Sequence, residues 1–368
     1  MGLIRTILAL SVVFAHTPHN FVFVGGPNAV RLFYMISGFL ISYVLSNTPS
    51  YSNPITFLAN RCLRLFPVYY VVALLTLAAF YFNPAFWHLF ERAPGLIKTI
   101  LVTVNVTLLG QDWILFVAVK NDTLMLTKSL TDTDLRLDEL LLVPQAWTLG
   151  LELTFYAIAP FIVRRPKILF ILFIGSVVAR AVAIYFGFGL EDPWTYRFFP
   201  FELAFFIAGV FSHRWLLDRI FRMTSNYPGF HIDSWVVGFC VAIFSSYFVW
   251  PMSESVNMTL LFSLMFFALP FLFCYQAGSR FDKWIGDLSY PLYIGHLLVL
   301  LTVAYLVKKY QLIEPLSLMR TFISVTAALA FAVLLKELVA DRVEKLRRAV
   351  KTSGELHSVG PAMLKVRP

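Results

Sequence analysis

The sequence predicts an all-α polytopic integral membrane protein, with about ten transmembrane helices plus one re-entrant or partly embedded segment. Of its 368 residues, 59% are hydrophobic and only 14% are charged, and the mean hydropathy is +0.74. Apolar runs of about 20 residues recur along the chain, and each could cross ~30 Å of hydrocarbon as a helix. No long polar stretch is left for a soluble domain. We therefore expect one membrane-embedded domain at 1–340, followed by a short basic tail at 341–368.

The apolar runs place ten spans and leave one further candidate. The expected spans are 3–24, 30–47, 66–82, 147–163, 167–187, 197–213, 233–250, 256–275, 288–306 and 316–336. The further candidate is 96–118, and it decides the topology. Lys and Arg concentrate on cytoplasmic loops, and the basic loops share one side of the membrane only if 96–118 does not cross.

We therefore expect 96–118 to be re-entrant or packed within an outward-facing segment, 83–146. Both termini are then cytoplasmic, on the same side as Arg61, Arg64 and the basic residues 164–167. Lys308 and Lys309 are exceptions, because they fall on the outer side. Arg5 and the apolar run after it could pass for a signal peptide. No A-x-A-like cleavage site follows, so we expect this run to be retained as the first span.

The cysteines predict neither a disulfide framework nor a metal site. Cys62, Cys240 and Cys274 are far apart in the sequence, and no CxxC pair occurs. The positive charge is explained by the basic loops, so no nucleic-acid partner is expected.

Four polar side chains from different spans are expected in one layer of the membrane. With a rise of ~1.5 Å per residue, His16, Ser37 and Arg180 come to ~20 Å above the cytoplasmic edge and Glu152 to ~22 Å. Ionisable groups at this depth require a partner or a wet cavity. Glu152 could orient the imidazole of His16. Arg180 could stabilise negative charge in a reaction, or it could simply form an ion pair with Glu152.

Arg5 and His16 are expected on one face of the first span. Eleven residues make about three turns, which separates the two side chains by ~16 Å along the axis. A ligand with phosphates at one end and a slim reactive arm, such as coenzyme A, would fit that distance. Two simpler interpretations stay open. Arg5 could be a topological anchor, and His16 a hydrogen-bonded core histidine.

Six motifs occur in order along the chain: Arg5-x10-His16 followed by LFYMISGFLIS, then NRCLRLFPVYY, QAWTLGLELTFY, FELAFFIAGV and IGDLSYPLYIGH. This series resembles that of the acyltransferase-3 family of membrane O-acyltransferases, from Arg5 to about residue 340. The resemblance implies a helical membrane enzyme that transfers an acyl group, commonly acetyl from acetyl-CoA, to a hydroxyl of a carbohydrate. It also implies a bacterial inner (cytoplasmic) membrane as the location.

The resemblance and the depth argument together give a set of candidate site residues. His16 and Glu152 are expected to be catalytic, with His16 as the general base for the hydroxyl proton. The donor is expected to be bound by Arg5, Arg61 and Arg64. Possible cavity-lining residues are Ser37, Trp147, Tyr156, Arg180, Tyr290 and His296, although His296 could equally be a buried structural histidine.

The expected co-substrates are acetyl-CoA or another acyl-CoA and a glycan or lipid-linked carbohydrate, with no permanently bound cofactor. A transporter or flippase of a lipid-linked or anionic solute is the competing class, and a structural membrane subunit is a third. The two halves of the chain show no repeat, which disfavours an inverted-repeat transporter. Two departures from the family pattern are Leu153 directly after Glu152, and Arg31 at the outer end of its span.

Overall fold

The computed structural model describes residues 1–19, 23–81, 83–120, 123–130, 133–188, 191–226, 232–311, 313–314 and 317–348. Of residues 224–226 it describes the backbone alone. Most of the predicted tail, 349–368, lies outside the described residues.

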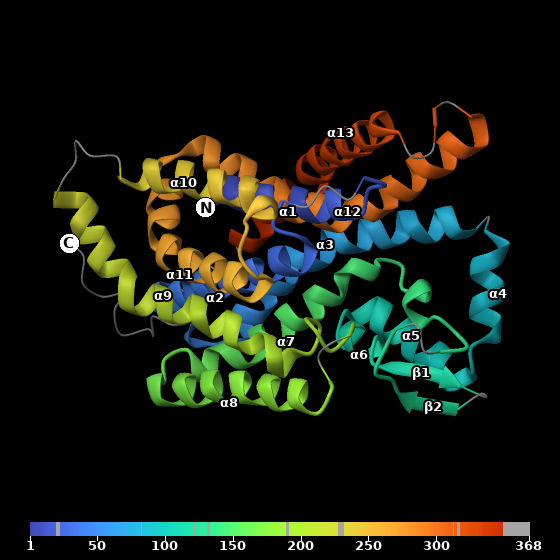
Figure 1. Cartoon of the computed structure of the whole chain (residues 1–368), viewed down its shortest axis with the longest axis horizontal. Helices are drawn as coiled ribbons and strands as arrows, with labels where there is room; N and C mark the ends of the chain where they lie inside the picture. Colours follow the sequence, from blue (N-terminus) through green and yellow to red (C-terminus); the bar gives the residue numbers. More distant parts are fainter. Residues whose placement is uncertain are drawn as a thin grey trace, which may run out of the picture.

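A helix occupies each of the ten expected spans (Figure 1). These helices are α1 Gly2–Ala15, α2 Gly26–Asn47, α3 Pro54–Tyr81, α7 Trp147–Ile162, α8 Pro166–Tyr185, α9 Phe199–Asn226, α10 Ile232–Ser246, α11 Glu254–Gly278, α12 Arg280–Tyr310 and α13 Leu318–Leu335. Within the described residues, 7 helical stretches are long and apolar enough to cross a membrane. The remaining three, α1, α7 and α9, are too short or too polar for that criterion, so the count of ten crossings stays a prediction.

The first helix is shorter than the sequence suggested, which corrects the expected span 3–24. Helix α1 ends at Ala15, and His16 is its C-cap residue. Pro18 follows two residues later, and the residue before a proline is disfavoured in the helical conformation. The expected span reached the apolar residues at 21–24, but residues 16–20, HTPHN, separate them from the apolar run of α1.

Segment 83–146 forms a compact group of short elements, at the right of Figure 1. It contains α4 Pro84–Arg92, α5 Gly95–Thr107, α6 Gln111–Ile114, the hairpin β1 Val117–Lys120 and β2 Thr123–Leu126, and the 3-10 turns η2 Leu137–Leu140 and η3 Pro144–Ala146. In the antiparallel hairpin Val117 lies opposite Leu126. The candidate 96–118 is therefore not one helix. It breaks at Leu108 and Gly110, whose φ angles are 61° and 79°, and the expected all-α class gains one small sheet.

One close crossing, between α2 and α9, fixes two helices that carry polar residues. A Cβ atom at Gly38 of α2 would lie 1.9 Å from the carbonyl oxygen of Phe206, and one at Gly209 of α9 would lie 1.9 Å from that of Met35. Only glycine permits this approach, as at other membrane helix crossings. The start of α1 is held differently, because the Asp282 carboxylate accepts from the amides of Gly2 and Leu3 at 2.7 and 2.8 Å. This cap fixes Arg5 one turn further along.

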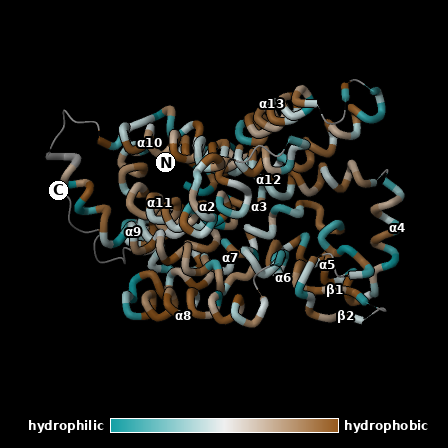
Figure 2. The backbone as a smooth tube through the Cα atoms, viewed as in Figure 1, coloured by the Kyte–Doolittle hydropathy of each residue, from teal (hydrophilic) through white to brown (hydrophobic). Residues whose placement is uncertain are grey.

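The outer helices present apolar side chains to their surroundings, and Figure 2 shows α8 as largely brown. Only 11% of the apolar window of α8 is buried inside the protein, and Phe170, Ile171 and Val178 are 58%, 68% and 53% exposed. A helix with so much exposed apolar surface would not be stable in water but is stable in lipid. The chain is therefore an integral membrane protein.

Candidate functional site

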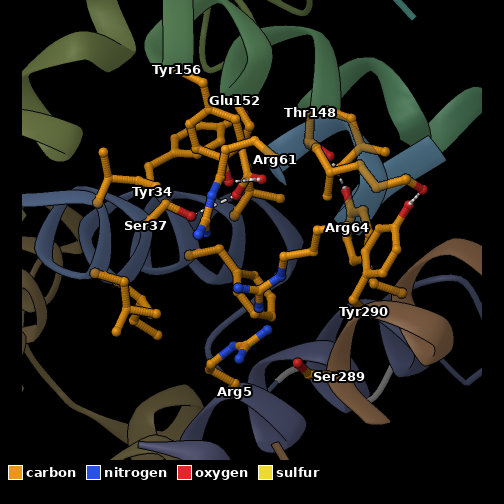
Figure 3. Close-up of a pocket in the computed structure, with 18 residues that line it drawn as sticks. Arg5, Tyr34, Ser37, Arg61, Arg64, Thr148, Glu152, Tyr156, Ser289 and Tyr290 are labelled. Atoms are coloured by element: carbon orange, nitrogen blue, oxygen red, sulfur yellow. Dashed lines mark hydrogen bonds between the residues drawn. The ribbon is translucent and has the colours of Figure 1, made fainter. Parts of the chain in front are cut away.

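A narrow cavity of about 80 Å³ lies between five helices. We call it the arginine cavity, and Figure 3 shows the guanidinium groups of Arg5, Arg61 and Arg64 turned toward its centre. The polar side chains on its wall are Arg5, Tyr34, Ser37, Arg61, Arg64, Thr148, Glu152, Tyr156, Ser289, Tyr290 and Tyr293. Three expected donor-binding residues from α1 and α3 are thus brought together, with Ser37, Tyr156 and Tyr290 around them.

Glu152 is held by two hydroxyl groups in this cavity. Ser37 Oγ donates to its Oε1 at 2.6 Å, and the Tyr156 hydroxyl donates to its Oε2 at 2.9 Å (Figure 3). Because both hydroxyls donate, the carboxylate acts as the acceptor and is fixed in orientation. The Ser37 bond connects α2 with α7 and brings Ser37 and Glu152 to the same depth, while the Tyr156 bond lies within α7.

The arginines of this cavity differ from ordinary structural arginines. Within the described part of the chain, Arg5, Arg61 and Arg64 have no carboxylate oxygen within 4.0 Å. Arg61 is only 5% exposed; its Nη2 donates weakly to the Asn60 side-chain oxygen at 3.4 Å, and its guanidinium lies 5.6 Å from the ring centroid of Phe57. Three guanidinium groups against the single carboxylate of Glu152 leave the wall with a charge of +2. Such a wall is suited to an anion, and the guanidinium fork matches phosphate well.

A second, larger cavity of about 450 Å³ follows the first one along α1 and α2. We call it the histidine cavity. It is lined by Val12, Ala15, His16, Gly25, Gly26, Pro27, Val30, Leu115, Leu130, Asp138, Pro144, Gln145, Trp147, Tyr196, Arg197, Tyr293 and Leu297. Val30 and Tyr293 line both cavities, so the two spaces share one thin wall. Helix α1 carries Arg5 into one cavity and His16 into the other.

The structure places His16 and Glu152 on the walls of two adjoining cavities. His16 lines the histidine cavity and Glu152 the arginine cavity. His16 is the C-cap residue of α1. Its ring Nδ1 lies 2.8 Å from the carbonyl oxygen of Val12. A carbonyl can only accept, so Nδ1 carries the proton and Nε2 keeps its lone pair. This tautomer leaves Nε2 available as a base.

His296 packs against His16, with ring centroids 5.1 Å apart. Its Nδ1 donates to the Tyr293 carbonyl at 2.6 Å, the side chain is fully buried, and it contributes to the wall of neither cavity described above. These contacts agree with a buried structural histidine rather than with a cavity-lining residue.

Arg180 lies on neither of these walls, and its partner is not the expected Glu152. It forms an ion pair with Glu202, which is fully buried and also lies 3.4 Å from Nε of Arg31. Arg31 Nη2 donates to the Thr195 carbonyl at 2.7 Å. The depth estimate pointed to Glu152 and did not consider Glu202.

The mouth of the histidine cavity contains residues that the sequence did not single out. Arg197 pairs with Asp192 through two bonds of 2.5 and 2.6 Å, and its guanidinium lies 4.6 Å from the ring centroid of Trp147. Tyr196 and Tyr293 complete an aromatic wall. Arg197 lies just before an apolar span, which is the one signal that could have drawn attention to it.

Long apolar helices around two adjoining polar cavities define a membrane protein whose interior can hold an anionic ligand beside a histidine. The acyltransferase domain family model matches residues 1–337. The chain therefore belongs to the acyltransferase-3 family and is a membrane acyltransferase. No curated protein and no solved structure matches the chain.

Proposed function

We propose that this acyltransferase moves an acetyl group from acetyl-CoA, or a related acyl group from its CoA ester, to a hydroxyl of a glycan or lipid-linked carbohydrate. His16 is the general base in this proposal, and Arg5, Arg61 and Arg64 bind the donor phosphates. The enzyme resides in the bacterial cytoplasmic membrane with both termini in the cytoplasm. Acyl-CoA is a co-substrate, and no permanently bound cofactor is required.

The observation that carries the proposal is the set of three arginines that have no carboxylate partner within the described part of the chain, in a cavity that adjoins the histidine cavity. Arg61 is buried and Arg5 and Arg64 are partly buried. Burying a cation without a partner is costly, and phosphates would relieve that cost. The ~16 Å between positions 5 and 16 of one helix suits a donor with phosphates at one end and a thioester at the other. A transporter would explain why three arginines line a cavity, but it would not explain why the chain matches an acyltransferase family.

The reaction follows from this arrangement. Nε2 of His16 removes the proton of the acceptor hydroxyl while the hydroxyl oxygen attacks the thioester carbonyl. The C–S bond then breaks, and the CoA thiolate leaves and takes up a proton. Glu152 does not orient the imidazole in this scheme, because the Val12 carbonyl does so. Its part is to offset the arginine charge and to fix Ser37 and Tyr156 around the donor arm.

The two cavities suggest two entrances. If the basic loops are cytoplasmic, the arginine cavity opens toward the side where acyl-CoA is made, and the histidine cavity opens outward. The acyl group then passes the shared wall of Val30 and Tyr293. The aromatic wall of Trp147, Tyr196 and Tyr293 is suited to a sugar ring, which stacks well on aromatic faces.

The test is transfer of radiolabelled acetyl from acetyl-CoA to a candidate glycan by the purified protein in lipid nanodiscs. We expect labelled glycan from the wild type and none from His16→Ala. Wild-type protein that does not bind CoA at all would overturn the proposal. Equal labelling by wild type and His16→Ala would remove the assigned base.

A further inference from the structure

The end of the last helix covers the start of α3. Beyond α13, a π-helical turn η5 at Lys336–Ala340 leads into further helix at 341–348, a stretch that the family match does not reach. There Arg347 Nη2 donates to Oδ1 of Asn60 at 3.2 Å, and Asn60 Nδ2 donates to the Arg347 carbonyl at 3.0 Å. These two reciprocal bonds fix Arg347 on α3.

Asn60 connects Arg347 with the donor site. Its Oδ1 also accepts from Arg61 Nη2 at 3.4 Å, so one neutral oxygen lies between two guanidinium groups. Among the described residues, Nε of Arg61 and Nε of Arg347 are both buried and have no hydrogen-bond partner. The Arg347 side chain is 19% exposed, and its carboxylate partner is Glu344. Two like charges held this close favour an anion that satisfies both.

Arg347 lies outside the arginine cavity, on the side of the α3 N-terminus. Its partner Asn60 directly precedes Arg61 on α3, and Arg61 and Arg64 line the cavity. In coenzyme A the thioester and the ribose 3′-phosphate are at opposite ends, and the diphosphate is between them. A donor whose thioester points toward His16 and whose diphosphate meets Arg61 and Arg64 therefore leaves its 3′-phosphate for a cation outside the cavity, such as Arg347.

We propose that Arg347 is a fourth donor-binding residue, which contacts the 3′-phosphate of the acyl-CoA nucleotide. The inference rests on the proposed function. It adds a residue from the C-terminal extension to the site, and it assigns a separate phosphate to that residue. Glu344 acts as a competitor that holds Arg347 until the phosphate replaces it. A phosphate monoester of a lipid headgroup would offer the same chemistry.

The experiment is calorimetric titration of CoA and of 3′-dephospho-CoA in nanodiscs of neutral lipid. For Arg347→Ala we expect a loss of CoA affinity of about ten-fold or more, the size of a charge-assisted hydrogen bond. Affinity for 3′-dephospho-CoA should stay within two-fold of wild type. Arg342→Ala is the matched control, because this arginine is exposed on the same helix, and it should change neither affinity.

Glu344→Gln keeps Arg347 in place and removes its competitor, so CoA should bind about two- to five-fold more tightly, the range of a partly exposed ion pair. A merely structural role for the Glu344 pair predicts weaker binding or no change, and either result would overturn the inference.

Equal losses of affinity for CoA and 3′-dephospho-CoA in Arg347→Ala, or no loss for either, would also overturn the inference. A titration in which anionic lipid alone abolishes the difference between CoA and 3′-dephospho-CoA would assign Arg347 to the lipid headgroup instead. If the wild type binds neither nucleotide, the proposed function fails together with this inference.

Discussion

The arginines near the two cavities differ in whether a carboxylate pairs with them. Near the histidine cavity, Arg31 and Arg180 share Glu202, and Arg197 is clamped by Asp192. In the arginine cavity, Arg5, Arg61 and Arg64 have no such partner among the described residues. A buried cation that is paired at once by its own chain holds helices or loops together. A buried cation left without a carboxylate is costly to keep, and that cost is explained if a ligand supplies the missing charge.

The largest effect should come from replacing His16, the residue that we assign as the general base. His16→Ala removes the only base that we assign, and general-base catalysis contributes about 10²- to 10⁴-fold to the rate. Affinity for CoA should stay within two-fold, because a base acts mainly in the transition state. Single-turnover acetyl transfer and CoA titration measure the two quantities separately. His88→Ala, on the exposed surface of α4, is the control, and a parallel loss of CoA affinity in His16→Ala would contradict the division of roles.

The paired arginines should behave as structural elements. Glu202→Gln leaves the buried Arg31 and the partly buried Arg180 without their carboxylate, and breaking a buried pair costs about 3–5 kcal/mol in the free energy of unfolding. Denaturation in detergent measures this loss, and CoA affinity of the folded fraction should not change. Glu254→Gln, at an exposed helix start, should cost little. Unchanged stability in Glu202→Gln would remove the contrast between the two arginine sets.

The unpartnered arginines should show the reverse pattern. Arg61→Ala removes phosphate contacts of about 1.5–3 kcal/mol, so CoA affinity should fall about ten-fold or more. The free energy of unfolding should stay equal or rise, since a like charge next to Arg64 disappears. Arg92→Ala, exposed at the end of α4, changes the net charge equally and serves as the comparison. A large loss of stability in Arg61→Ala without any loss of affinity would return Arg61 to a structural role.

The smallest effect is expected where the charge is kept. Arg5→Lys preserves the cation but loses the planar fork that binds phosphate through two parallel bonds. We expect CoA affinity to fall by about three- to ten-fold, or roughly 0.7–1.4 kcal/mol. Titration of Arg5→Lys beside Arg92→Lys measures it, and unchanged affinity would mean that Arg5 acts only through its charge.

The sequence predicted the helices well because apolar runs report directly on the lipid environment. It placed a helix at every expected span, and it selected three arginines that the fold gathers from α1 and α3. It failed where hydropathy and backbone geometry disagree. The expected first span reached 24 across residues 16–20, HTPHN, although α1 ends at Ala15, and 96–118 is apolar although Leu108 and Gly110 break it.

Ion-pair partners could not be predicted because they depend on how helices meet. Depth alone suggested Glu152 as a partner for Arg180, whereas the packing of α8 on α9 pairs it with Glu202. Arg347 was assigned to a tail, because nothing in a run of charged residues shows that its helix returns to Asn60. Contacts between residues 287 positions apart are a property of the packing rather than of local sequence.

The wall shared by the two cavities has an electrical consequence. Val30 is aliphatic, and the Tyr293 hydroxyl is tied to Thr148 and Gln145 at 3.1 and 3.2 Å, so neither offers a path for ions. A charge driven through a membrane gains or loses about 2.3 kcal/mol per 100 mV. In the proposed reaction the transferred acetyl group is neutral, and the phosphates of its donor would stay on the arginine side. The membrane potential would therefore do no work on the acetyl group itself. The wall between the cavities would block ions and still allow the acetyl group to pass.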